Sequence, residues 1–119
     1  MKRKVEFFRH NIGNEEIERV TDVLQSLFIT TGNEVMEFEE SLAIFLGLPS
    51  TAAVTSCTAA MQLALLAAGV GEGDEVITTP LTFVGTPNSV IMAGGRPVFA
   101  DVERETGNID PTAVENAVT

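Results

Sequence analysis

A run of small residues, Ser56-Cys57-Thr58-Ala59-Ala60, lies between the apolar residues 52–55 and a helical pattern over residues 61–68. A helix that begins in such a run leaves backbone N–H groups unpaired, with the positive end of its dipole behind them. This arrangement binds phosphate, and the Thr58 hydroxyl adds a further donor. Cys57, Thr58 and Ala59 are therefore candidate phosphate-binding residues. The alternative is that Ser56 and Thr58 only cap the helix.

Phe83 follows an expected strand, at the end of a sheet where ligands gather in open α/β proteins. The alternative for Phe83 is an ordinary core residue. Thr30, Thr31 and Gly32 form a polar turn between two expected helices, either as a plain connection or as part of a binding site.

Other kinds of site find little support in this sequence. Cys57 is the one cysteine and His10 the one histidine, too few for a zinc site and without a motif that pairs them for nucleophilic catalysis. The glycines at positions 69, 71 and 73 lie after a helix and before a strand, which is the reverse of a dinucleotide-binding loop. The acidic residues 34, 37, 39 and 40 indicate a solvated helix face.

Periodicity and capping signals predict the elements that would position these residues. The apolar spacing predicts a helix over residues 15–26 that starts at an Asn14 cap, and a second that starts after Asn33 and ends at Gly47. From residue 52 onward, short apolar runs alternate with amphipathic ones, which is typical of a parallel α/β sheet. Strands are predicted at residues 52–55, 75–79 and 97–100, and helices at 58–68, 83–93 and 111–118.

Composition limits the class of protein. A chain of 119 residues is about one domain, and a net charge of −10 with seven basic residues argues against nucleic-acid binding. A single cysteine excludes an internal disulfide. The charged residues after the basic start do not form a signal peptide, and no stretch is as apolar as a membrane span. We therefore expect a cytoplasmic protein without a membrane partner.

The order of several motifs resembles one family, the PLP-dependent sugar aminotransferases of the DegT/DnrJ/EryC1/StrS group. The matching stretches are residues 29–32 with 37–39, 56–60, 73–77, 97–102 and 108–111. They are collinear over nearly the whole chain, and together they are specific although each is weak alone.

The resemblance implies the amino-terminal part of a PLP-transferase type I large domain, with two leading helices followed by βαβαβα and parallel strands. On that basis residues 1–50 are a helical segment and residues 51–119 an incomplete cofactor-binding domain. Pyridoxal 5′-phosphate (PLP) is the implied cofactor. Cys57, Thr58 and Ala59 would hold its phosphate and Phe83 would lie against its ring, while Thr31 and Gly32 would border the substrate.

The same resemblance implies transfer of an amino group, usually from glutamate, to a nucleotide-linked keto-sugar by a homodimer. No catalytic residue is assigned within the chain, because the family's Schiff-base lysine and its pyridine-pairing aspartate match positions beyond residue 119. Lys2 and Lys4 match neither of them. The isolated chain is therefore expected to be inactive. A sugar dehydratase of the same family and a non-catalytic phosphate-binding module remain alternatives.

Overall fold

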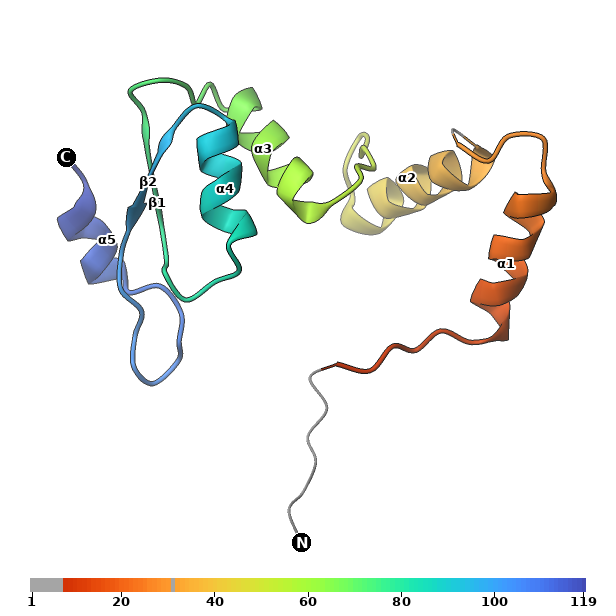
Figure 1. Ribbon diagram of the computed structural model, residues 1–119, viewed down its shortest axis with the longest axis horizontal. Coiled ribbons are helices and arrows are strands. Elements are labelled where there is room, and N and C mark those ends of the chain that lie inside the picture. Colours follow the sequence, from red (N-terminus) through yellow and green to blue (C-terminus); the bar gives the residue numbers. More distant parts are fainter. Residues whose placement is uncertain (1–7, 31) are drawn as a thin grey trace, which may run out of the picture. The chain divides into compact units, whose positions relative to one another are not determined.

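The computed structural model describes residues 8–30 and 32–119, which are shown as a ribbon in Figure 1. The chain separates into two compact units, residues 1–53 and 54–119. Each unit is described by itself.

The first unit contains helices α1 (Asn14–Gln25) and α2 (Asn33–Leu46). Helix α1 is capped by Gly13 and not by Asn14 as predicted, because the Gly13 N–H donates to Glu16 Oε2 at 2.6 Å and Asn14 already has helical geometry. Helix α2 ends as predicted at Gly47, whose φ of 66° is left-handed and suits glycine.

An exposed cation joins the two helices of this unit. Arg19 Nη2 of α1 lies 3.1 Å from a Glu34 carboxylate oxygen and 3.4 Å from one of Glu37, both on α2. Such exposed pairs contribute up to about 1 kcal/mol each. The acidic face of α2 is thus partly neutralised from α1.

The second unit contains three helices and a short parallel sheet. Its elements in chain order are α3 (Cys57–Ala67), β1 (Glu75–Thr78), α4 (Gly85–Met92), β2 (Arg96–Phe99) and α5 (Pro111–Ala117). The register places Glu75 opposite Arg96 and Thr78 opposite Phe99, and the Glu75 and Arg96 side chains form an ion pair. The α/β class and the parallel strands are confirmed.

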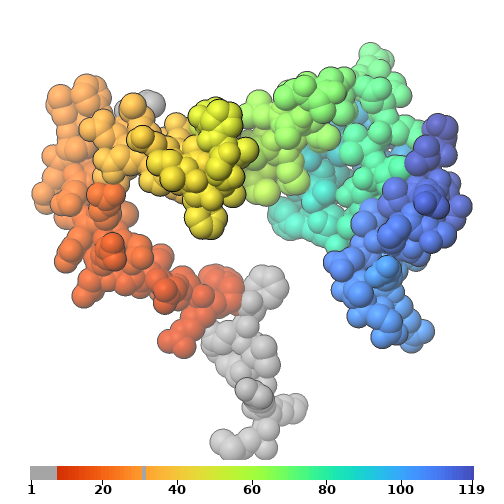
Figure 2. Space-filling view, turned by 180° about the vertical axis from the view of Figure 1, so that it is seen from behind, coloured from red at the N-terminus to blue at the C-terminus, as the bar shows by residue number. Residues whose placement is uncertain are grey.

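Helix α4 lies between α3 and the two strands (Figure 1). On the face shown in Figure 2, the yellow-green atoms of α3 adjoin the cyan atoms of α4. Val90, Ala93 and Ala100 are buried here with Ser89, whose hydroxyl donates to the Thr86 carbonyl at 2.7 Å. Gln62 Nε2 of α3 also donates to the Met92 carbonyl at 3.1 Å, at the end of α4.

The strand predicted at residues 52–55 is wrong, because this segment has no regular structure. A strand exists only through backbone hydrogen bonds to a neighbouring strand. Here the Ala53 N–H instead donates to Glu39 Oε1 at 2.7 Å, and Thr51 Oγ1 donates to the Glu39 carbonyl at 2.7 Å. The other predicted strands and helices are confirmed to within two residues at each end.

The described helices are short, and α2 has 14 residues. None of them combines the length and the apolar character that crossing a membrane would require.

Candidate functional site

The first turn of α3 has two amide hydrogens to offer a ligand. The Ser56 side chain caps the helix, accepting from the Ala59 N–H at 3.1 Å, and the Ser56 carbonyl accepts from the Ala60 N–H at 3.0 Å. The N–H groups of Cys57 and Thr58 have no hydrogen-bond partner among the described residues. Capping by Ser56 therefore leaves the first two amides of the helix available, and it occupies that of Ala59.

The Thr58 side chain is half-buried and faces the start of α4. A Cβ atom placed on Gly85 would lie 2.8 Å from Thr58 Oγ1, so the hydroxyl group lies against the glycine backbone. The same Cβ would lie 3.0 Å from Phe83 Cδ1 and 3.2 Å from Phe83 Cε1. Thr58 and Phe83, which are far apart in sequence, therefore both lie against Gly85.

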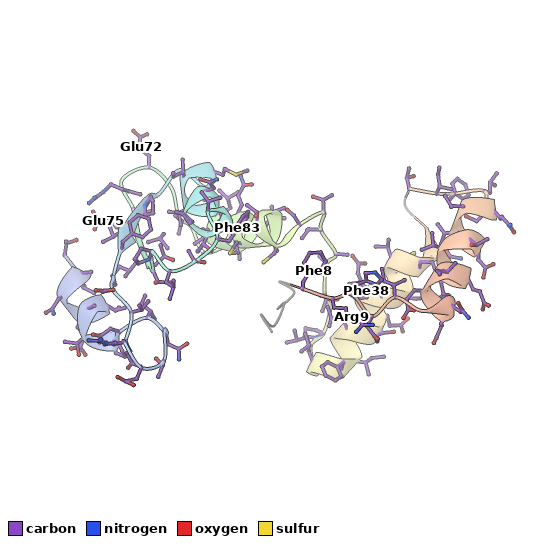
Figure 3. All side chains as sticks on the ribbon, turned by 60° about the horizontal axis from the view of Figure 1, so that its bottom comes forward. Phe8, Arg9, Phe38, Glu72, Glu75 and Phe83 are labelled. Carbon is purple, nitrogen blue, oxygen red and sulfur yellow. The ribbon has the colours of Figure 1, made fainter. Side chains whose placement is uncertain are left out.

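Phe83 is a surface residue, since 77% of it is exposed. Figure 3 shows its side chain beside α3 and α4. Local hydrogen bonds fix the loop that carries it: the Phe83 carbonyl accepts from the Thr86 N–H at 3.0 Å, and the hydroxyls of Thr82 and Thr86 share a hydrogen bond of 2.9 Å. An exposed ring on a fixed loop can cover a flat ligand.

The remaining predicted residues of the site are Cys57, Ala59, Thr31 and Gly32. Cys57 is exposed as the first residue of α3, and Ala59 is half-buried with its N–H already bonded. Thr31 lies outside the described residues. Gly32 is half-buried at the N-cap of α2 and borders a cavity of about 400 Å³ between the end of α1 and the start of α2. Gly32 belongs to the first unit, whereas Thr58 and Phe83 belong to the second.

Sequence reasoning missed Gly85. It is buried, and the two side chains that the sequence had singled out both lie against it. The available signal was a glycine two residues after Phe83, in the first turn of the expected helix, where glycine has a lower helix propensity than alanine. The arrangement as a whole offers two amide donors, a hydroxyl and an aromatic face, which suits a ligand that combines an anion with a flat ring.

Residues 10–119 match the DegT/DnrJ/EryC1/StrS aminotransferase family. The spore coat polysaccharide biosynthesis protein SpsC of Bacillus subtilis is 53% identical over 108 residues, covering 91% of this chain and 28% of SpsC.

Solved structures are also similar to this chain. The Streptococcus pneumoniae protein Spr1654, named as a sugar aminotransferase and solved in apo, PLP and PMP forms, superposes with a TM-score of 0.88 at 35% identity. That match covers 97% of this chain and 29% of Spr1654. An aminotransferase from Psychrobacter cryohalolentis matches with a TM-score of 0.83 at 37% identity, covering 92% of this chain and 28% of that one. The chain thus spans less than a third of the length of these relatives.

Proposed function

Because the chain belongs to the DegT/DnrJ/EryC1/StrS aminotransferase family, we propose that residues 54–119 form part of the PLP-binding site of a sugar aminotransferase. The observation that carries this proposal is the meeting of Thr58 Oγ1 and the Phe83 ring at Gly85, next to the unpaired amides of Cys57 and Thr58. Spr1654, whose fold this chain shares over 97% of its length, was solved with PLP and with PMP.

The residues present fit the cofactor in both of its parts. A phosphate needs several converging donors, and the first turn of α3 supplies two backbone N–H groups and the Thr58 hydroxyl with the helix dipole behind them. A pyridine ring needs a flat apolar surface, and the exposed Phe83 ring provides one close to that hydroxyl.

PLP, when bound, supplies an electron sink for amino-group chemistry. The residues of this chain would bind and orient it and would not move protons. The backbone amides of Cys57 and Thr58 would hold the phosphate. Because a backbone donor does not depend on the side chain, a cysteine at position 57 is compatible with this role. Phe83 would cover one face of the ring and fix its tilt.

The finer proposals concern the whole protein. We propose that it transfers an amino group, usually from glutamate, to a nucleotide-linked keto-sugar, as a homodimer in the cytoplasm. The relation to SpsC, named for spore coat polysaccharide biosynthesis, supports a sugar substrate. Thr31 and Gly32 are proposed to border that substrate. The lysine that would bond covalently to PLP is not among the residues proposed here.

Titration of PLP and PMP into the purified chain, followed by calorimetry, tests the proposed site. A hydrogen bond to a charged group contributes about 1.5–3 kcal/mol, so Thr58→Ala should raise the Kd for PLP about 10- to 150-fold. Aromatic stacking contributes about 0.5–1.5 kcal/mol, so Phe83→Ala should raise it about 2- to 10-fold.

Two variants away from the site serve as matched controls. Thr112→Ala removes an exposed threonine from α5, and Phe45→Ala removes an exposed phenylalanine from α2. Both should leave the Kd unchanged. The proposal fails if millimolar PLP does not bind the unmodified chain, or if the control variants weaken binding as much as the variants in the site.

A further inference from the structure

We propose that Gly85 is a positioning residue for the cofactor, because its lack of a side chain lets the Thr58 hydroxyl and the Phe83 ring approach the same ligand. This inference rests on the proposed function and adds to it a residue that contacts both candidate cofactor-binding side chains. Gly85 is buried as the first residue of α4, and both Thr58 of α3 and the Phe83 ring lie close to its α-carbon.

Space, and not backbone conformation, explains the glycine at this position. The glycines with a positive φ are Gly47, Gly69, Gly73, Gly94 and Gly107, and Gly85 is not among them. A β-carbon at Gly85 would meet Thr58 Oγ1 at 2.8 Å, closer than real β-carbons approach other atoms. Alanine would therefore suit the backbone and would be excluded only by its two neighbours.

An added methyl group would act on the side chains proposed to bind PLP. The Thr58 hydroxyl must rotate away from its position, and the Phe83 ring, 3.0 Å from the added carbon, must shift on its loop. The hydroxyl then leaves the position that it holds against Gly85, from which it is proposed to bind the phosphate. Forcing a side chain off its preferred rotamer should raise the Kd for PLP about two- to tenfold in Gly85→Ala, and more in Gly85→Val.

Two other glycines of the same unit provide matched controls. A β-carbon at Gly71 has nothing within 4 Å, so Gly71→Ala should leave both the Kd and the melting temperature unchanged. A β-carbon at Gly95 would lie 2.9 Å from Val70 Cγ1 and 3.3 Å from Val90 Cγ1. Gly95→Ala should therefore lower the melting temperature by overpacking and should leave the Kd for PLP unchanged.

The decisive measurement is a double-mutant cycle on PLP affinity in the purified chain, using Gly85→Ala and Thr58→Ala. If Gly85 acts by making room for the Thr58 hydroxyl, Gly85→Ala should weaken PLP binding much less in the Thr58→Ala background than in the unmodified chain. The reason is that Thr58→Ala removes the Oγ1 atom with which the added methyl group clashes. An equal increase in the Kd for PLP in the two backgrounds would overturn the inference. So would unchanged affinity in Gly85→Ala, or a loss of affinity in Gly95→Ala as large as in Gly85→Ala.

The proposed function and the role of Gly85 fail in different ways. If the unmodified chain does not bind PLP, the proposed function is wrong and the role of Gly85 falls with it. If the unmodified chain and the Gly71→Ala variant bind PLP and Gly85→Ala binds equally well, only the role of Gly85 is wrong. Circular dichroism of each variant shows whether the helices are retained.

Discussion

Glu16 shows how one side chain adjusts the start of a helix. Its carboxylate accepts a hydrogen bond from the Gly13 N–H at 2.6 Å, at the end of α1 where the helix dipole favours negative charge. The backbone N–H of Gly13, followed by that of Glu16 itself, holds the pKa of Glu16 below its ordinary value of 4.5. The ionised form of Glu16 therefore stabilises the helix start.

The sign of the resulting pH dependence follows from the lowered pKa. The stabilisation by Glu16 is fully present above the ordinary value of 4.5 and is lost as the pH falls through the lower pKa of the folded chain. In an NMR titration, Glu16 should titrate below that ordinary value, and Glu16→Gln should remove part of the acid-induced loss of α1 helicity. Glu18→Gln is the control, since Glu18 has no hydrogen bond or ion pair among the described residues. Identical acid profiles for the two variants would contradict the prediction.

The residues of the candidate site differ in how far sequence could predict them. Thr58 and Phe83 could be singled out by chemical type and by position at the ends of expected elements. Gly85 could not, because its proposed role depends on distances to Thr58 Oγ1 and Phe83 Cδ1 that appear only when α3 packs on α4. Ala59 was chosen as an amide donor, and the Ser56 side chain occupies that amide in the structure.

Among the elements, α3 depends most directly on one capping side chain. Ser56 Oγ accepts from the Ala59 N–H, and replacement of such a cap by alanine costs about 1 kcal/mol. Ser56→Ala should therefore lower the free energy of unfolding by about that amount in a urea titration followed by circular dichroism. Ser41→Ala, at an exposed position inside α2, should not lower it, because alanine has the higher helix propensity. An equal loss in both variants would show that the cap has no special role.

Local signals predicted most of the elements because those elements are fixed locally. Asp110 caps α5 through the Thr112 N–H at 2.8 Å, with Pro111 in the first turn, as its sequence indicates. Gly69 and Gly94 follow α3 and α4 with φ of 87° and 91°. The segment 52–55 was mispredicted, because its apolar composition is typical of a strand. Strand formation also requires a pairing partner, which local composition does not reveal.

At the scale of the whole molecule, the buried apolar side chains are small. Among the described residues they are Ala43, Val90, Ala93 and Ala100, whereas Leu27 is 88% exposed and Phe45 is 84% exposed. Full burial of a leucine or phenylalanine stabilises a fold by about 1.5–3 kcal/mol. Much of that stabilisation is not realised within this chain.

We therefore expect the isolated chain to self-associate or to be only marginally stable. In sedimentation velocity, the average mass should rise with concentration, and thermal unfolding should be broad. Saturating PLP should raise the melting temperature if the proposed site is present, since a ligand that binds the folded state stabilises it. A monomeric sample with one sharp, cooperative transition would contradict this expectation.

The hydrogen bond from Gln62 Nε2 to the Met92 carbonyl affects more than the end of α4. Gln62 is one helical turn after Thr58, so both side chains project from the same side of α3. The Gln62 hydrogen bond and the packing of Thr58 against Gly85 therefore lie along one side of α3, where it faces α4. Loss of the Gln62 amide would remove the hydrogen bond and leave packing alone to hold this side of α3, so it would act on the proposed phosphate site from a residue outside that site.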